Sequence, residues 1–300
     1  MTLEELARTA PFARPPAVPA WSLGCFHRRS ITYATGAEDM ATRVIWVQSH
    51  GLTGDLRLPA ARPDVGHRRG LADCTADELA ALAQGEGGVA DTGLCDGRMT
   101  WSNWAAFQPY DKWPEPGELR RVGPALIEFA PSGIYVEDWR LQPGSAGLRV
   151  GLRLVSETPP GGPEAPRDGG LVIAGEHAIF ALARRAALPA QAPVHRQLAV
   201  DPSLAAAAFD ARALYARRGV GGGWRVALSV DPFAEGAFLD LGGFRASGPG
   251  ELLQSLEDGT ARRWRIDTLL ADQPAEPATG ADEVALAWLA GEGDTLPPAR

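Results

Sequence analysis

The stretch PALIEFAPSGIYVEDWRL, residues 124–141, decides the fold prediction because it holds two strand-length segments around a tight turn. Apolar and aromatic residues dominate 125–130 and 134–141, and both segments are of the length typical of strands. The intervening PSG ends in Gly133, which can adopt the positive φ of a tight hairpin turn. The stretch therefore predicts an antiparallel β-hairpin.

Two carboxylates, Glu128 and Glu137, stand inside these predicted strands. Alternation places Tyr135, Glu137 and Trp139 on one face of the second strand, while Glu128 shares a face with Leu126 in the first. A carboxyl group held between aromatic rings loses hydration, which raises its pKa towards the range of a general acid or base. A hollow barrel would use such groups to hold a ligand. The alternatives are a surface hairpin, or a buried one in which Glu137 pairs with an arginine of an adjacent strand.

Further strand-length segments occur on both sides of the hairpin. Gly, Pro, Asn or Asp separates nearly every pair of segments, as turns require. The connections are too short for the crossover helices of a parallel sheet, so we predict an all-β fold with minor α content, built as two antiparallel barrels or one large curled sheet. The expected strands outside the hairpin are SITYAT, TRVIWVQS, LTGDLRL, MTWSNWAAF, LRVGLRLVSE, GLVIAG, HAIFALARRA, HRQLAV, WRVALSVDP, AFLDLGGF and RRWRIDTLL.

Two segments carry helix signals. CTADELAALAQG, residues 74–85, has Thr75 as an N-cap candidate followed by acidic residues. GADEVALAWLAGEG, residues 280–293, has the same acidic start before an apolar run. SLAAAAFDARALYARRG, residues 203–219, is ambiguous because its alanines favour a helix while its later part alternates. We expect that later part to pair with the strand at 224–231.

Pro, Gly and charged residues without periodicity mark SETPPGGPEAPRDGG as the boundary between two halves. The expected organisation is an N-terminal arm at 1–25, a first β-barrel with the ligand site at 26–156, a linker or long loop at 157–170, a second β-barrel or sheet at 171–272, and a C-terminal helix and tail at 273–300.

The segment LTGDLRL predicts a strand with one ionic and one apolar face. Asp55 and Arg57 project from one side, and Leu56 and Leu58 from the other. Such a strand is half exposed or lines a polar cavity. If the ionic face points inward, Arg57 can pair with Glu137 or hold a carboxylate or enolate oxygen, with Asp55 orienting it. If it points outward, the ion pair contributes little to stability.

Tryptophan is frequent in the chain, and MTWSNWAAFQ, residues 99–108, holds two. Strict alternation places Trp101 on one face, and Trp104 and Gln108 on the other. Rings on both faces suit a barrel wall with one face in a pocket and one against a neighbouring layer. Packing of large residues in a core is the alternative.

His50 follows the run VIWVQS at a strand end. A histidine at a barrel mouth can act as an acid, a base or a haem ligand, although most such histidines are turn residues. No HxH, HxxxH or CxxC pattern occurs, and three scattered cysteines fit neither a zinc site nor a disulfide framework. The GxSxG elbow, the P-loop and a GxGxxG after a strand are missing as well. We therefore expect no metal and no cofactor.

Charge and hydropathy narrow the class of partner. The net charge of −8 and the scattered arginine pairs argue against nucleic acid, which needs a basic stripe. No apolar stretch approaches the ~20 residues of a membrane span, and the start MTLEELARTAPFARPP lacks the apolar run of a secretory signal. The expectation is a cytoplasmic protein without a membrane partner.

The strand pattern of residues 30–270, together with WVQSHGLTGDLRLP and IYVEDWRL, resembles the lipocalin-like (calycin) group. Some members of that group pack two barrel halves together, among them carotenoid hydratases and pericyclase-type enzymes of natural-product pathways. The resemblance implies an antiparallel lipocalin-like β-barrel. It transfers no catalytic residue, because neither segment is a diagnostic motif.

The leading hypothesis is a cofactor-independent small-molecule enzyme of isomerase, hydratase/dehydratase or cyclase type. Glu137 or Glu128 would be the acid or base, with Arg57 and Asp55 beside them, and the ligand would be a small apolar or aromatic molecule. The alternatives are a non-catalytic carrier of a hydrophobic ligand or haem, and a structural or protein-interaction module with filled barrels. A homodimer is left open. The residues expected to contact the substrate are Trp101, Trp104, Gln108, Tyr135, Trp139 and His50.

Overall fold

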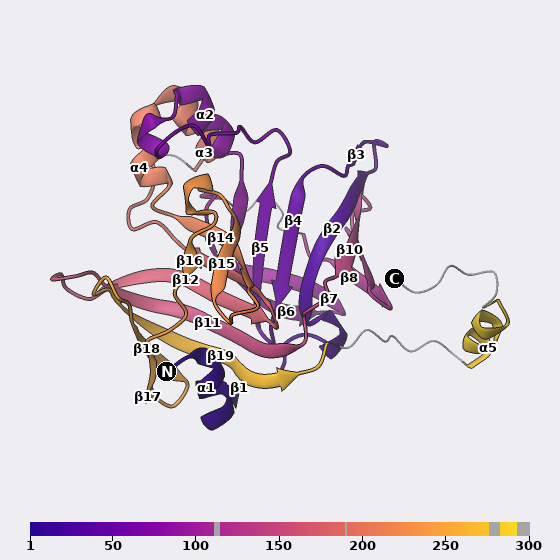
Figure 1. Ribbon diagram of the computed structural model, residues 1–300. Helices are drawn as coiled ribbons and strands as arrows, with labels where there is room; N and C mark the ends of the chain where they lie inside the picture. Colours follow the sequence, from indigo (N-terminus) through magenta and orange to yellow (C-terminus); the bar gives the residue numbers. More distant parts are fainter. Residues whose placement is uncertain (111–114, 190, 276–282, 293–300) are drawn as a thin grey trace.

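The computed structural model describes residues 1–110, 115–189, 191–275 and 283–292, and antiparallel sheet dominates it (Figure 1). Every strand pairing in these residues is antiparallel. The prediction of an all-β fold with minor α content is confirmed.

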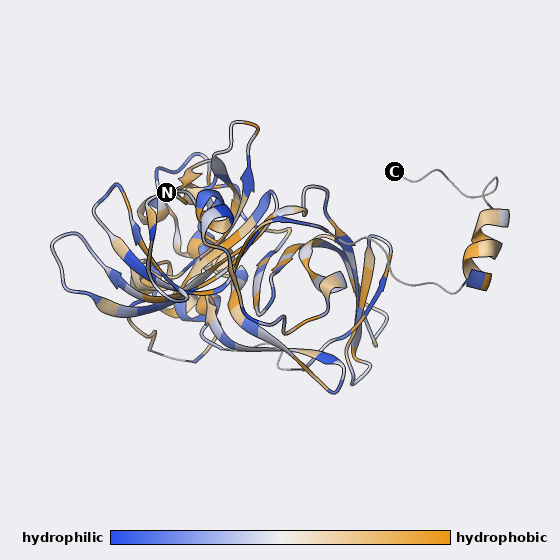
Figure 2. Cartoon of the chain, turned by 90° about the horizontal axis from the view of Figure 1, so that it is seen from below, coloured by the Kyte–Doolittle hydropathy of each residue, from blue (hydrophilic) through white to orange (hydrophobic). Residues whose placement is uncertain are grey.

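The N-terminal sheet has nine strands, in the order β7-β6-β5-β4-β2-β10-β9-β8, with β3 beside β2. A bridge between Met99 and Gly117 brings its two ends together at one point, and Figure 2 shows the resulting curl nearly end-on. The strands are β2 (Gly24–Tyr33), β3 (Glu38–Asp39), β4 (Arg43–Gln48), β5 (Leu52–Leu58), β6 (Glu86–Cys95), β7 (Arg98–Ala106), β8 (Glu118–Val122), β9 (Ala125–Phe129) and β10 (Tyr135–Leu141).

The second sheet has ten strands, in the order β16-β15-β14-β13-β12-β11-β19-β18-β17, with β1 beside β19. The strand expected late in 203–219 is β14, and it pairs with β15 as predicted. The strands are β1 (Phe12–Ala13), β11 (Gly147–Thr158), β12 (Ala165–Ala174), β13 (His177–Leu182), β14 (Arg212–Arg218), β15 (Trp224–Ser229), β16 (Phe238–Leu239), β17 (Phe244–Gly248), β18 (Glu251–Ser255) and β19 (Ala261–Gln273).

The outer face of the N-terminal sheet packs on the second sheet through a shared apolar core. Leu56 and Val89 contribute from the first sheet, and Ile179 and Ala213 from the second. Each fully buried side chain of this kind contributes about 1.5–3 kcal/mol. The sheets approach so closely that a Cβ atom on Gly54 would lie 2.5 Å from the Cβ of Ile179. Glycine is therefore required at that contact.

The opposite face of the second sheet is covered by the N-terminal arm. Leu3 and Leu6 of α1 (Leu3–Thr9) join the apolar core that contains Trp264. After α1, β1 pairs with β19, and Phe12 of β1 packs against the same core. The chain then crosses to β2 and the N-terminal sheet.

Three short helices gather at one end of the molecule (Figure 1). They are α2 (Ala76–Leu82), α3 (Val194–Val200) and α4 (Ala205–Ala208). The N-cap predicted at Thr75 is confirmed, because its hydroxyl accepts from the backbone N–H of Glu78 while the Glu78 carboxylate accepts from that of Thr75. A further helix, α5 (Glu283–Gly291), lies inside the segment 280–293 predicted as helical, whose ends are outside the described residues.

One predicted strand is wrong, and several observed strands, among them β6, β8 and β18, were not predicted. HRQLAV, expected as a strand, belongs to α3, where Val194, Gln197 and Leu198 are buried at helical spacing. β6 was not predicted as a strand, because its glycines lower strand propensity. Gly87 in that strand is needed because a Cβ atom there would lie 2.8 Å from the Cβ of Ala213 in the second sheet.

The segment 157–170, expected as a linker or long loop, instead contains the paired ends of β11 and β12 and the turn between them. The chain passes from one sheet to the other at residues 142–146, between β10 and β11. β11, assigned from the sequence to the first barrel, is thus a central strand of the second sheet. The division of the chain into two domains stays a prediction.

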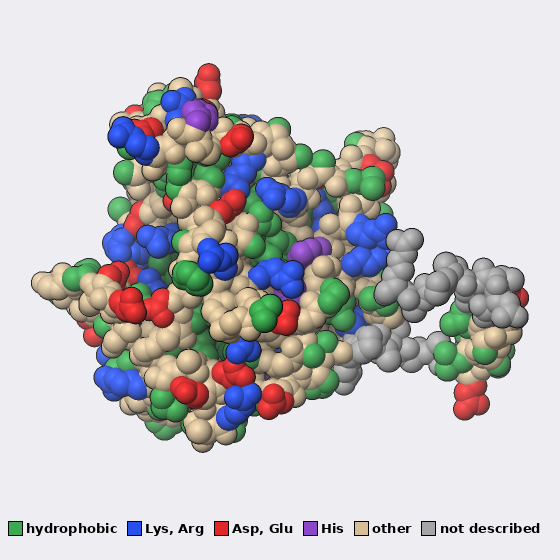
Figure 3. All heavy atoms as spheres, viewed as in Figure 1, with side chains coloured by type: hydrophobic (Ala, Val, Ile, Leu, Met, Phe, Trp, Pro, Cys, Tyr) green, Lys and Arg blue, Asp and Glu red, His purple; other side chains and the backbone are tan. Residues whose placement is uncertain are grey.

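Acidic and basic side chains are interspersed on the face seen in Figure 3, with no continuous basic stripe on that face. Within the described part of the chain, no helix has both the length and the apolarity needed to cross a membrane.

Candidate functional site

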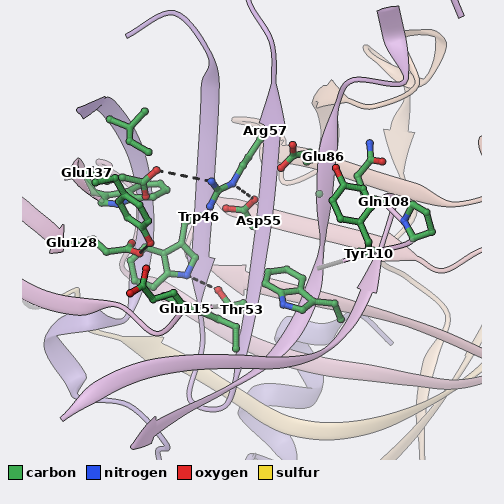
Figure 4. Close-up of a pocket in the computed structure, with 18 of the residues that line it drawn as sticks. Trp46, Thr53, Asp55, Arg57, Glu86, Gln108, Tyr110, Glu115, Glu128 and Glu137 are labelled. Carbon is green, nitrogen blue, oxygen red and sulfur yellow. Dashed lines mark hydrogen bonds and ion pairs between the residues drawn. The ribbon is translucent and has the colours of Figure 1, made fainter. Parts of the chain in front are cut away.

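A cavity of about 360 Å³ lies inside the curl of the N-terminal sheet (Figure 4). Strands β5, β7, β9 and β10 supply much of its wall, and Ala183 and Arg184, just after β13, complete it from the second half. The volume falls at the lower end of the ~300–1,000 Å³ typical of small-molecule sites. The interior of this sheet is therefore hollow.

Both carboxylates of the opening hairpin face this cavity. Tyr135, Glu137 and Trp139 are buried and line it, as their alternation along β10 predicted. Glu137 stands directly opposite Glu128 in the register of β9 and β10. Like charges at facing positions of a strand pair repel each other, so the pair favours a state in which one carboxyl group keeps a proton.

Glu128 is the group that keeps the proton. Burial, and then the negative charge of Glu137, raise the pKa of Glu128 to about 8. Its Oε1 accepts a hydrogen bond of 3.1 Å from the Tyr135 hydroxyl, which opposes part of that rise. Gly117 leaves room beside it, since a Cβ atom there would lie 3.0 Å from Trp101 and 3.1 Å from Oε1 of Glu128. A protonated carboxyl group therefore borders an aromatic ring at neutral pH.

Glu137 is held by an arginine of the neighbouring strand. Nη1 of Arg28 on β2 lies 2.6 Å from Oε1 of Glu137, and Nη2 of Arg28 lies 2.9 Å from Asp39. Arg57, the partner considered from the sequence, is farther away, with Nη1 3.9 Å from the same oxygen. Arg28 was missed because the strand predicted there began only at Ser30. Since this ion pair occupies one oxygen of Glu137, Glu128 is the stronger candidate for proton transfer.

The ionic face of β5 points into the cavity, while its leucine face joins the core between the sheets. Nε of Arg57 donates to Oδ1 of Asp55 at 2.9 Å. Burial raises the pKa of Asp55, although Arg57 acts against the rise. An anionic ligand approaching Arg57 would meet both Asp55 and Glu137. The geometry therefore disfavours the idea that Arg57 holds a carboxylate or enolate oxygen.

Trp101 and Trp104 both line the cavity, although strict alternation had put them on opposite faces. β7 carries one extra residue between two successive pairings with β6, and Asn103 in this bulge has a φ of 53°. The extra residue reverses the alternation, so Trp101 joins the face of Trp104. Arg153 of β11 donates to the carbonyl of Asn103 at 2.5 Å, which fastens the bulge to the second sheet.

Two further indoles differ in how their N–H groups are satisfied. Trp46 meets Trp139 edge-on, with ring centroids 5.7 Å apart, and its N–H donates to Oγ1 of Thr53 at 2.5 Å. The buried N–H of Trp139 has no hydrogen-bond partner within the described residues.

Two of the expected contacts have other surroundings. Gln108 lines the cavity, but its amide donates to the carbonyls of Ala83 and Gly85, at 3.0 and 2.7 Å, and accepts from the N–H of Val194 at 3.0 Å. It connects the end of α2 to the start of α3. His50 lies in the turn between β4 and β5 and is not part of the cavity wall.

Sequence reasoning left out several lining residues. The alternation of TRVIWVQS could have indicated Trp46, since it faces Asp55 across β4 and β5. No pattern pointed to the others, which lie outside regular strands or in segments not assigned as strands. The aromatic and charged lining residues left out are Trp46, Glu86, Tyr110, Glu115 and Arg184.

The described residues form no site that is ready to bind a metal ion. No group of three or more His, Cys, Asp or Glu side chains there is arranged to hold a metal ion.

Comparisons with known proteins give no family. No family model matches the chain, and no curated protein matches it. Among solved structures, an uncharacterized protein, YLR301w from Saccharomyces cerevisiae, aligns over 81% of this chain and 97% of its own, with 11% sequence identity and a TM-score of 0.45.

Proposed function

We propose that this protein is a small-molecule enzyme that transfers protons through Glu128 inside the N-terminal cavity. The observation that carries the proposal is a buried carboxyl group with a pKa of about 8, facing a hollow lined by aromatic rings. A group with a pKa close to the working pH can both give and take a proton efficiently. Isomerisation, hydration, dehydration or cyclisation would suit such a group.

The neighbours of Glu128 have distinct roles in this proposal. Glu137, which is paired with Arg28, raises the pKa of Glu128 across the strand pair. The Tyr135 hydroxyl donates a hydrogen bond to Oε1 of Glu128, and Oε2 would exchange the proton with the ligand. Trp101 and the other indoles shape the cavity and exclude water, which strengthens these electrostatic interactions. A lipocalin-like (calycin) relationship would fit this use of a curled sheet.

The proposal is tested by incubating the protein with fractionated metabolite extracts in D₂O and following masses by spectrometry. Proton transfer to carbon adds deuterium even where the product is an isomer of the substrate. We expect Glu128→Gln to slow turnover of the responding metabolite by about 10²–10⁴-fold, the usual contribution of a general acid or base. Asp138→Asn, on the outward face of β10, is the matched control and should keep wild-type turnover.

A carrier is the alternative that the same cavity allows. It would retain a ligand stoichiometrically, with no deuterium uptake and no change of mass in any fraction. Equal turnover by Glu128→Gln and the wild type would also contradict the proposed role of Glu128.

A further inference from the structure

The cavity gathers aromatic rings on several sides. The face of such a ring carries negative electrostatic potential and attracts a cation within about 6 Å. Surfaces built from several rings are the usual receptors for quaternary ammonium groups. The described rings that line the cavity are Trp46, Trp101, Trp104, Tyr110, Tyr135 and Trp139.

The charged groups of the cavity wall also favour a cation over an anion. Among the described lining residues there are five carboxyl groups and two guanidinium groups. Both guanidinium groups are engaged, Arg57 by Asp55, and Arg184 by the carbonyls of Phe107 and Ala208 at 2.6 and 3.1 Å. Arg28 behind the wall neutralises Glu137, and Glu128 holds a proton, so among the described groups four carboxylates remain against three guanidinium groups. A bound cation would offset this small negative excess, whereas a bound anion would add to it.

Within the described residues no arginine or lysine forms an ion pair with Glu128, which holds a proton instead. Glu137 has Arg28 as its counter-ion, whereas Glu128 faces Glu137 and the Tyr135 hydroxyl. Arg57 also acts on Glu128 and lowers its pKa, but Arg57 is bonded to Asp55, whose charge acts in the opposite direction. The facing carboxyl groups and the adjacent ring of Trp101 therefore form a subsite with an aromatic side and an acidic side.

We propose that the cavity binds an organic cation, a protonated amine or quaternary ammonium group carried on an apolar or aromatic body. The cationic group contacts Trp101 and the Glu128–Glu137 pair, and the body lies against Trp46 and Trp139. The identification of this cation as the substrate rests on the proposed function; the binding itself does not.

Binding of a cation has a proton linkage that binding of a neutral molecule lacks. A positive charge beside Glu128 favours its ionised form, so the protein releases a proton as the ligand binds near neutral pH. Affinity for the cation therefore rises with pH until Glu128 is ionised in the free protein as well, at about pH 8.

Three probes of nearly equal size separate the ligand classes: benzyltrimethylammonium, its neutral isostere neopentylbenzene, and the anion phenylacetate. Quenching of tryptophan fluorescence and calorimetry report binding to the full-length protein. We expect benzyltrimethylammonium to bind at least roughly tenfold more tightly than neopentylbenzene, the order of a desolvated cation–π contact with a nearby carboxylate. Its affinity should rise between pH 6 and 8, while that of neopentylbenzene stays constant.

The variant Glu128→Gln should abolish this pH dependence and reduce the preference for the cation, and Asp138→Asn should change neither. The proposal is overturned if neopentylbenzene or phenylacetate binds as tightly as the cation, or if the cation does not bind at millimolar concentration. Cation preference without turnover of any metabolite would contradict only the proposed enzyme activity. Turnover of a neutral or anionic metabolite would contradict only the ligand class.

Discussion

Glu128 in the N-terminal sheet and Glu157 in the second sheet are equally buried, each 5% exposed, but their surroundings differ. Arg167, Arg185 and Arg262 approach the Glu157 carboxylate to 2.9, 2.6 and 3.0 Å. Burial alone would raise the pKa of Glu157, but these arginines outweigh it and lower the pKa. Glu128 has a tyrosine hydroxyl and a second carboxylate in their place.

Burial raises the pKa of both carboxyl groups, and the comparison shows that their partners decide whether that rise is reversed, as at Glu157, or reinforced, as at Glu128. Glu157 connects β11 to β19 and to the segment after β13, and its charge is satisfied in every direction. Glu128 borders an open cavity, and its partners leave it protonated at neutral pH. Buried carboxyl groups with perturbed pKa values of the second kind are concentrated at functional sites.

The largest effect in this comparison is expected from removing the charge of Glu157. Glu157→Gln leaves Arg262 without its counter-ion and leaves Arg167 with Asp210 alone, and we expect it to lower the free energy of unfolding by about 3 kcal/mol. Urea denaturation at pH 7 measures this change. A loss below about 1 kcal/mol would mean that the arginines find other partners or water, and the contrast with Glu128 would weaken.

The pH dependence of stability should have opposite signs at the two positions. Glu128 has a raised pKa in the folded protein, so its contribution is favourable at low pH and is lost between its ordinary value of 4.5 and about 8. Glu128→Gln should therefore become more stable than the wild type as pH rises through this window. Glu157, with a lowered pKa, stabilises the fold above 4.5 and loses that contribution in acid. Thermal unfolding from about pH 2 to pH 9 covers both windows and checks both signs, and parallel curves for the two variants would contradict the assignment.

The smallest effect is expected from substituting an exposed strand residue that has a positive φ, one in each sheet. Asn103 in β7 and Asp272 in β19 each have a φ of 53°. A β-branched residue at either position should cost about 1–2 kcal/mol of stability. Asn103→Val should in addition weaken binding of benzyltrimethylammonium, because the bulge orients Trp101 and Trp104. Asp272→Val is the matched control, and an equal loss of probe affinity in both variants would mean that the bulge has no special role.

Local rules in the sequence sufficed for much of the cavity wall. Alternation alone put Tyr135, Glu137 and Trp139 on one face, and Asp55 with Arg57 on one face of β5. Each of these faces lines the cavity. Strand alternation is a strong constraint because a shift by one residue would exchange apolar and ionic faces.

The remaining features depend on contacts between distant segments. The bulge at Asn103 is held by Arg153 from the other sheet, and Arg184 reaches the cavity from beyond β13. No local pattern in the sequence encodes either contact. The pairing of Arg28 with Glu137 depends on how far β2 extends and on the irregular register between β2 and β10. His50 was placed correctly at a strand end, but at an end outside the cavity.

Gly54 gives the molecule a way to adjust its cavity from behind. The residues on either side of it, Thr53 and Asp55, belong to the lining, while its own Cα backs onto Ile179. A larger residue at position 54 would push β5 towards the cavity, because Ile179 cannot move away without disturbing the core of the second sheet. Selectivity for ligand size is thereby open to tuning by exchanges at the Gly54–Ile179 contact, with every group that touches the ligand left unaltered.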